Sequence, residues 1–160
     1  MAELTWDELW MGFADKASEK SKDRSRQIGA VIVGDDNRMV SMGWNGFPRG
    51  VDDDVEERHQ RPAKYLWTEH AERNALYNAA AVGAAVKGSA IYQTMFPCAD
   101  CARGIVQSGI RRVVTVEPDW NDPTYAEQWA TAKEMFDETG VEVQFVEGTS
   151  PVRVEDISLT

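Results

Sequence analysis

The sequence predicts an α/β protein of three layers, α/β/α, in which helices cover both faces of a five-stranded mixed sheet. The order of the expected elements predicts this class, and the chain length predicts a single domain. A β-hairpin pattern near the N-terminus is followed by alternating strand and helix patterns, an order typical of mixed sheets covered on both faces. The 160 residues also match the length of one domain with enough core to fold without disulfide bonds. We expect one domain over residues 1–148 and a C-terminal tail over 149–160.

The first elements are a helix and a hairpin. Apolar residues recur at helical spacing over 5–18 behind the capping box Thr5-Trp6-Asp7-Glu8, which predicts an amphipathic helix. Two β-rich segments, 27–33 and 38–44, flank the turn residues 34–37, and this arrangement predicts an antiparallel hairpin.

The rest of the chain alternates between loops, helices and strands. The polar segment 46–62 lacks periodicity, so we expect a long functional loop there. An alanine-rich run over 68–82 predicts a buried helix that ends near Gly83. The remaining expected elements are a strand over 90–94, a helix over 97–108, a strand over 112–116, a helix over 123–139 and a strand over 141–146.

Charge and hydropathy exclude several classes of function. Asp and Glu total 27 against 17 Lys and Arg, and the net charge of −10 repels polyphosphate backbones. No apolar run approaches the roughly 20 residues that a membrane span needs, and the N-terminus has an acidic composition unlike a leader peptide. We therefore expect a cytoplasmic protein with neither a membrane nor a polynucleotide partner.

Two short motifs contain the residues suited to chemistry. His70-Ala71-Glu72 opens one expected helix, and Pro97-Cys98-Ala99-Asp100-Cys101 opens the next. Cysteines three apart on a first helical turn lie on one face, where the helix N-terminus favours thiolates. With His70 they form a three-ligand zinc site that leaves a fourth position for water, as catalytic zinc sites do. We expect one Zn²⁺ per chain, which lowers the pKa of that water to about 7.

Glu72 is the expected proton carrier. Residues two apart point in different directions within a helix, so His70 and Glu72 can serve one site only if His70 lies at the helix entrance. Glu72 then stands beside the water and passes its proton to the substrate. His-x-Glu followed by Pro-Cys-x-x-Cys is the signature of the zinc deaminases.

Three simpler interpretations of these residues carry less weight. The cysteines could form a redox pair, but no thioredoxin-like strand pattern precedes them. A closed structural zinc site would need His59 as its fourth ligand. His70 alone would be an ordinary core histidine, but it coincides with Glu72 and the cysteine pair.

The sequence resembles the deoxycytidylate (dCMP) deaminases of the cytidine deaminase-like superfamily from about Lys16 to Val143. The resemblance rests on segments 21–23 (SKD), 27–30 (QIGA), 43–50 (GWNGFPRG), 70–75 (HAERNA), 96–102 (FPCADCA) and 107–110 (QSGI). It implies that His70, Cys98 and Cys101 bind zinc and that Glu72 shuttles protons. The enzyme would convert dCMP to dUMP and ammonia with Asn45 holding the sugar, and Trp44 and Asn74 are further candidates for substrate binding.

The resemblance also bears on assembly and regulation. It implies a homo-oligomer, and Trp120, Tyr125 and Trp129 are candidates either for its contact surface or for the core. Many family members have Tyr where this chain has Trp44, and the ligands of a second, structural zinc found in some members are missing. Mg²⁺ would enter only with a regulatory nucleotide, and we interpret the acidic triple 52–54 as part of a solvated loop.

A monophosphate substrate needs local cations in so acidic a protein. Lys20, Lys22, Arg24 and Arg26 alternate before the first strand, so an extended chain would place them on one side. We take Lys22, Arg24 and Arg26 as phosphate-binding candidates, and a second group, Arg58, His59, Arg61 and Lys64, lies in the loop before His70.

Other functions remain open from the sequence. The alternatives are deamination of another nucleotide, a nucleoside or a base, including adenosine in tRNA, and a catalytically silent zinc-binding regulatory module. The acidic balance counts against tRNA, and the presence of Glu72 counts against a silent module, because zinc binding alone does not need it.

Overall fold

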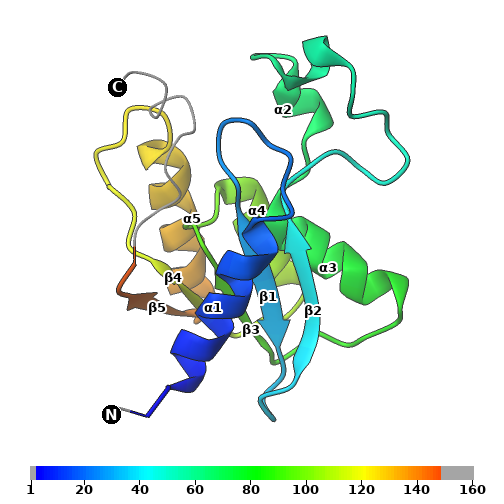
Figure 1. Ribbon diagram of the computed structural model, residues 1–160. Helices are drawn as coiled ribbons and strands as arrows, with labels where there is room; N and C mark the ends of the chain where they lie inside the picture. Colours follow the sequence, from blue (N-terminus) through cyan, green and yellow to red (C-terminus); the bar gives the residue numbers. More distant parts are fainter. Residues whose placement is uncertain (1–2, 149–160) are drawn as a thin grey trace.

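The computed structural model describes residues 3–148 and confirms the predicted α/β/α class (Figure 1). The expected tail, 149–160, lies outside the described residues. The elements are α1 (Trp6–Ser18), β1 (Gly29–Val33), β2 (Met39–Trp44), the 3₁₀-helix η1 (Glu56–His59), α2 (Lys64–Trp67), α3 (Ala71–Ala81), β3 (Ala90–Gln93), α4 (Ala99–Gln107), β4 (Arg112–Val116), α5 (Ala126–Thr139) and β5 (Glu142–Val146).

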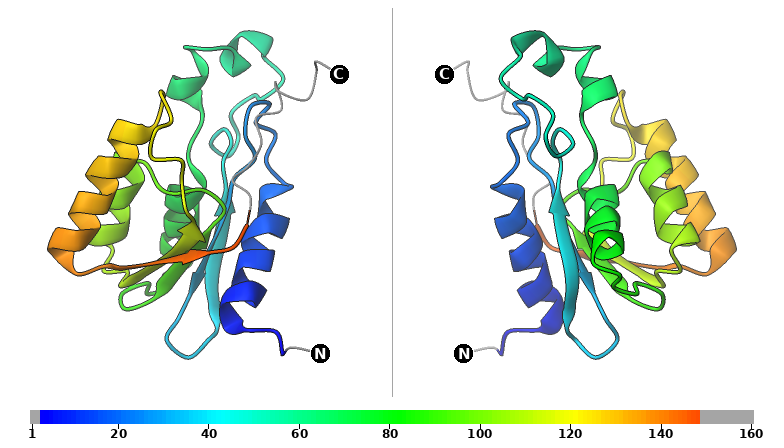
Figure 2. Two further views of the ribbon diagram at one scale, coloured as in Figure 1. Left: turned by 90° about the vertical axis from the view of Figure 1, so that its left-hand side faces the viewer. Right: turned by 90° about the vertical axis from the view of Figure 1, so that its right-hand side faces the viewer.

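The sheet has five strands in the order β2-β1-β3-β4-β5. β1 pairs antiparallel with both β2 and β3, whereas β3, β4 and β5 run parallel to one another. Helix α1 covers one face, and α3, α4 and α5 cover the other (Figure 2). Because β1 is antiparallel to both neighbours, its start lies beside the end of β2 and beside the end of β3. These three strand ends therefore lie at the same edge of the sheet.

Strand alternation divides the core into two parts. All five residues of β1 are buried, with Ala30 and Ile32 facing α3 and with Val31 and Val33 facing α1. This continuous apolar pattern is expected of a strand that is covered on both faces. The larger core cluster lies under α3, α4 and α5, and it includes Phe136 at full burial.

Two helices start three residues later than predicted, for local reasons. The predicted helix start at 68 is wrong, because Glu69 forms an isolated β-bridge with Gly46 that keeps residues 68–70 out of α3. The predicted start at 123 is also wrong, because the Asp122 carboxylate accepts the N–H groups of Thr124 and Tyr125 and forms a turn before α5.

The segment predicted as a loop over 46–62 contains η1, and α2 follows it as a separate short helix. Aromatic contacts fix this region. The ring of Phe47 stacks on His59 with centroids 4.8 Å apart, and the Arg58 guanidinium lies 4.2 Å from the centre of the Trp67 ring. These contacts between residues up to 12 positions apart have no periodic sequence signal, which explains why the helical turns were not predicted.

Candidate metal centre and active site

The candidate ligands are brought together by two helix N-termini at one edge of the sheet. His70 is the N-cap of α3 and Cys98 is the N-cap of α4, and both have extended backbone conformations. Cys101 lies in the first turn of α4. Because α4 follows directly after β3, its N-terminus lies at the end of that strand, and the pairing of Glu69 with Gly46 places His70 at the same edge.

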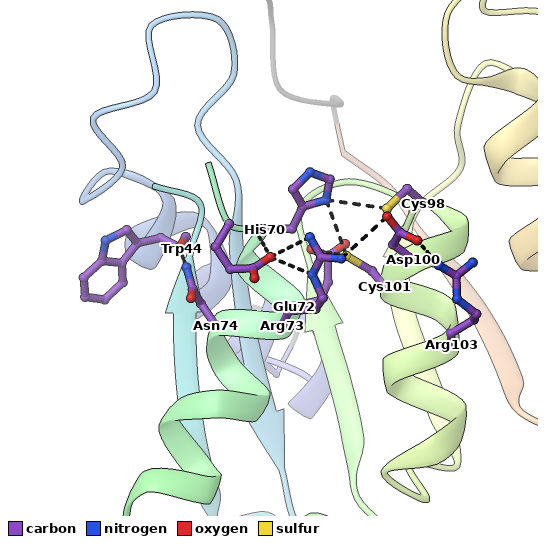
Figure 3. Close-up of polar contacts among 10 residues, drawn as sticks. Trp44, His70, Glu72, Arg73, Asn74, Cys98, Asp100, Cys101 and Arg103 are labelled. Carbon is purple, nitrogen blue, oxygen red and sulfur yellow. Dashed lines mark hydrogen bonds and ion pairs between the residues drawn. The ribbon is translucent and has the colours of Figure 1, made fainter. Parts of the chain in front are cut away.

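The donor set fits a zinc ion. His70 Nδ1 lies 3.5 Å from Cys98 Sγ and 3.4 Å from Cys101 Sγ (Figure 3). The three donor atoms all lie within 4.8 Å of one another. Cysteine sulfur and imidazole nitrogen are ligands that zinc prefers. A set of three protein ligands is also the number that catalytic zinc sites commonly have. Within residues 3–148 this is the one group of three or more such side chains that could hold a metal ion.

Hydrogen bonding between the ligands shifts their pKa values in opposite directions. The pKa of the Cys98 thiol is lowered to about 4, chiefly by the hydrogen bond from Cys101, and the pKa of the Cys101 thiol is raised. The pKa of His70 is raised, first by its hydrogen bond with Cys98. The ligand cluster therefore holds one thiolate readily, and a cation bound there would favour the second.

Glu72 lies beside the ligands without belonging to the three-residue cluster. Its side chain is buried at 4% exposure in the first turn of α3, and Oε2 lies 3.5 Å from Cys101 Sγ. Burial raises the pKa of the carboxyl group. A buried carboxylate at this distance can exchange a proton with a group held at the metal position.

Arg73 is a residue of the site that sequence reasoning missed. Its guanidinium contacts Glu69, with Nε 2.6 Å from Oε1, and lies 3.7 Å from Asp100 Oδ2 on α4 (Figure 3). Glu69 Oε1 also accepts the N–H of His70 at 2.9 Å. Arg73 therefore links the two helix N-termini that present His70 and Cys98. The sequence signal that could have identified Arg73 is its position directly after Glu72.

A cavity that is partly open to solvent adjoins the candidate ligands. His70, Glu72 and Cys98 line it on the metal side, and Asn45 and Arg26 line it on the hairpin side. The other lining residues are Asp23, Ser25, Ile28, Arg61, Lys64, Tyr65, Thr68, Ala71, Met95, Phe96, Tyr125 and Trp129. Most of the surface that these residues expose to the cavity is apolar, and the polar and charged side chains among them can orient a small polar ligand.

Asn45 occupies a fixed position in this cavity. Its side chain is buried, Oδ1 accepts the N–H of Ile28 at 2.8 Å, and Nδ2 donates to the carbonyl of Arg26 at 2.8 Å. The side chain therefore joins the end of β2 to the segment that enters β1. One N–H of the amide group and a lone pair of Oδ1 are left for a ligand.

The structure separates the three phosphate-binding candidates. Arg26 lines the cavity, whereas Lys22 Nζ lies 2.7 Å from Asp53 and Arg24 Nη1 lies 2.7 Å from Glu56. The prediction that the cations of this segment lie on one side is therefore wrong. The two ion pairs direct Lys22 and Arg24 toward Asp53 and Glu56, whereas Arg26 lines the cavity. Lys64 and Arg61 of the second predicted group reach the cavity, and Lys64 Nζ pairs with Asp23 at 2.9 Å.

Trp44 and Asn74 lie elsewhere. Asn74 Nδ2 donates to the Trp44 carbonyl at 2.8 Å (Figure 3). Both residues line a different surface pocket, together with Phe47, Pro48, Arg49, Glu69, Tyr77 and Asn78. Neither residue lines the cavity beside His70. By contrast, Tyr125 and Trp129 line that cavity, and sequence reasoning offered them only as contact surface or core.

Comparison with known proteins identifies the family. A family model described as "Cytidine and deoxycytidylate deaminase zinc-binding region" matches residues 4–117. The chain belongs to this family. The resemblance predicted from the sequence is thereby confirmed, and a zinc-binding deaminase region covers the candidate ligands.

Named deaminases are similar over most of the chain. A probable deoxycytidylate deaminase of Drosophila melanogaster is 37% identical over 150 residues, which cover 87% of this chain and 71% of the relative. The deoxycytidylate deaminase of Homo sapiens is 35% identical over 143 residues, which cover 86% of this chain and 78% of the relative. Among solved structures, the dCMP deaminase from cyanophage S-TIM5 in complex with dCMP and dUMP superimposes with a TM-score of 0.70 and has 25% sequence identity. The match covers 91% of this chain and 100% of that chain.

No helix within residues 3–148 combines the length and hydropathy that a membrane span requires.

Proposed function

We propose that this protein catalyses the zinc-dependent hydrolytic deamination of dCMP to dUMP and ammonia. The observation that carries the proposal is the buried Glu72 carboxylate next to the His70, Cys98 and Cys101 cluster at the wall of a cavity. This arrangement matches the chemistry of zinc deaminases. The family match and the similarity to deoxycytidylate deaminases support dCMP as the substrate.

His70, Cys98 and Cys101 would hold one zinc ion per chain. When bound, zinc lowers the pKa of water to about 7 and so supplies a nucleophile at neutral pH. Three protein ligands leave one position of a tetrahedral ion for that chemistry. Arg73 acts on the ligands indirectly, because it fixes the N-termini of α3 and α4 relative to each other.

Glu72 moves the protons of the reaction. Deamination forms a C–O bond at C4 of cytosine, breaks the C4–N bond and releases ammonia, and the water supplies the protons that the departing amine needs. The Glu72 carboxylate takes one proton from water and delivers it to ring nitrogen N3. It then takes the second proton from the oxygen bonded to C4 and delivers it to the departing amine. Its burial excludes bulk water from this transfer.

The other end of the cavity holds the sugar and the phosphate. Asn45 offers its free amide N–H to the sugar from a position fixed by two backbone hydrogen bonds. Arg26 offers a guanidinium group to the 5′-phosphate from the same segment. Both residues line the same cavity as Glu72, so a nucleotide that contacts them can place its base next to the candidate zinc ligands.

The test is ammonia release by the zinc-loaded protein from dCMP, CMP, deoxycytidine, dAMP and GMP. We expect the highest kcat/KM with dCMP. Highest activity with dAMP or GMP would contradict the proposed base, and highest activity with deoxycytidine would indicate a nucleoside deaminase. Absence of ammonia from all five compounds, with zinc present by elemental analysis, would exclude the proposed deamination of dCMP.

A further inference from the structure

We propose that Tyr125 is a positioning residue that holds the Arg26 guanidinium in the cavity, ready for the substrate's phosphate. The inference rests on the proposed function, because it requires a phosphorylated substrate. It concerns a side chain from the far end of the chain, at the N-terminus of α5, that reaches a residue just before β1. Three features of the structure support it.

The backbone of Arg26 is fixed on both sides. Its N–H donates to Asp23 Oδ1 at 3.1 Å, and its carbonyl accepts from Asn45 Nδ2 at 2.8 Å. The same Asp23 oxygen accepts from the N–H of Ser25 at 2.7 Å and pairs with Lys64. The Cα of Arg26 therefore has a defined position at the cavity wall, and only the long side chain needs further restraint.

The side chain rests on a stack of aromatic rings. The guanidinium carbon of Arg26 lies 4.9 Å from the centre of the Tyr125 ring, which is within the range of a cation–π interaction. The Tyr125 ring stacks on Trp129 with centroids 5.4 Å apart and planes at 23°. Trp129 is 4% exposed, and its indole Nε1 donates to the Phe96 carbonyl at 3.0 Å. The stack is thus anchored in the core.

The guanidinium group keeps donors free. Among the ion pairs of residues 3–148, none includes Arg26, although neighbouring Lys22 and Arg24 each pair with a carboxylate. Arg26 Nε is buried without a hydrogen-bond partner, and the contact of Nη1 is to the weak acceptor Sδ of Met95 at 3.6 Å. A buried donor without a partner is costly, which points to an anionic ligand at this position.

Stacking and phosphate binding use different parts of an arginine. An aromatic ring contacts the face of the guanidinium, whereas the N–H donors project from its edge and can form two parallel bonds to a phosphate. Tyr125 can therefore restrain Arg26 without competing for the ligand. Loss of a residue that acts in this way should lower kcat/KM more for the phosphorylated substrate than for the unphosphorylated one.

The experiment compares Tyr125→Leu with Tyr125→Phe in the zinc-loaded protein. The readout is the ratio of kcat/KM for dCMP to kcat/KM for deoxycytidine. We expect Tyr125→Leu to lower this ratio about 3- to 30-fold, mainly through a higher KM for dCMP, because it removes the ring. Tyr125→Phe keeps the ring and should retain the ratio within about 2-fold. Tyr125→Met provides a second variant without the ring should the Leu variant fold poorly.

A double-mutant cycle with Arg26→Gln tests whether Tyr125 acts through Arg26. In the Arg26→Gln background, Tyr125→Leu should change the ratio by less than about 2-fold. Arg38→Gln is the matched control, because it removes one positive charge from an exposed hairpin turn, and it should keep the wild-type ratio.

Independent effects of the two substitutions, or equal losses with both substrates, would overturn the inference. Equal activity of the wild-type protein on dCMP and deoxycytidine would also overturn it while leaving a deaminase function in place. A wild-type protein that deaminates neither substrate would exclude both proposals.

Discussion

At the scale of single residues, the candidate site depends on the conformation of two N-cap residues. His70 and Cys98 have extended backbones, so their side chains leave the chain before the helical turn begins. This is why His70 and Glu72, two residues apart, both reach the same small space, which two positions inside a helix could not do. His70 and Glu72 can therefore serve one site because α3 begins between them.

Replacing Glu72 with Gln should separate catalysis from metal binding. We expect the Glu72→Gln variant to keep its zinc and its fold while turnover of dCMP falls by at least ~10²-fold, because an amide cannot carry the proton. The measurements are ammonia release, zinc content and thermal unfolding of the same preparations. Loss of zinc in this variant would instead place Glu72 among the ligands.

Removing a proposed zinc ligand should have the opposite signature. We expect Cys101→Ala to lose zinc and to lower the free energy of unfolding as well as the activity, since metal binding is coupled to folding. Zinc content by elemental analysis and urea unfolding test this expectation. An active Cys101→Ala variant, or a wild-type protein that stays active after exhaustive chelation, would contradict the assignment.

At the scale of elements, the position of α3 depends on a close approach to β2. A Cβ added to Gly43 would lie 2.4 Å from the backbone N of Ala75 and 2.6 Å from the carbonyl oxygen of Ala71. Real Cβ atoms essentially never come this close to backbone, so α3 would have to move away from the sheet. Because His70 and Glu72 lie at the start of α3, the fit of helix to strand sets their distance from Cys98 and Cys101.

Gly43→Ala should therefore reduce both stability and zinc affinity. We expect the free energy of unfolding to fall by about 2 kcal/mol or more, as for other overpacked sites. Gly12→Ala is the control, because Gly12 is exposed on α1 with no atom near the added Cβ, and it should be stabilising by about 0.5–1 kcal/mol. Chemical unfolding and zinc titration of both variants test the contrast, and a Gly43→Ala protein with wild-type values would refute it.

Helix α1 is attached to the sheet by a polar network. The Asp7 carboxylate accepts from Arg112 Nη1 at 3.0 Å and Nη2 at 2.8 Å, and from the Tyr92 hydroxyl at 2.9 Å. The hydrogen bond from Arg112 is the main cause of the lowered pKa of Asp7, and burial is the main cause that raises the pKa of Tyr92 to about 12. The network joins α1, β3 and β4 at the end of the molecule away from the metal centre.

This network predicts an acid-dependent contribution to stability. Because the pKa of Asp7 is lower in the folded chain than its ordinary 3.8, the contribution is present above that pH and is lost as pH falls through the folded value. We expect wild type to exceed Asp7→Asn in unfolding free energy by about 1 kcal/mol at neutral pH, since the pair is partly exposed. Urea unfolding over a pH series should show this difference shrinking in acid. A difference that stays constant with pH would contradict the assignment.

At the scale of the whole molecule, charge separates the proposed substrate from the alternative of tRNA. The net charge of −10 opposes a polyanion over a large surface, whereas a single nucleotide meets only the cavity, whose lining includes the cations Arg26, Arg61 and Lys64. A small phosphorylated substrate therefore avoids most of the repulsion.

We accordingly expect no tight, salt-sensitive binding of tRNA. Fluorescence anisotropy with labelled tRNA at low and physiological salt measures this directly, and dCMP turnover in the same buffers serves as the activity control. Editing of tRNA adenosine at a rate comparable to dCMP deamination would show that the mean charge does not decide the substrate class.

The extent to which the sequence predicted the site differs from residue to residue. His70, Glu72, Cys98 and Cys101 were predictable because their spacing within two short motifs is itself the signal, and the structure places them together. Lys22 and Arg24 were expected beside the substrate, but the structure pairs them with Asp53 and Glu56 of a loop. Ion pairs between segments about 30 residues apart leave no local pattern to read.

The sequence by itself determined the α/β class, the order of the main helices and strands, and the donor set for zinc. These follow from local physics, namely capping, hydrophobic periodicity, strand alternation and ligand chemistry. Only the tertiary structure decided that Tyr125 and Trp129 border the cavity, that Trp44 and Asn74 line a different pocket, and that Arg26 is the cation without a carboxylate partner among the three predicted. Those contacts join residues up to 99 positions apart, and they depend on how the helices pack against the sheet rather than on any neighbouring residue in the chain.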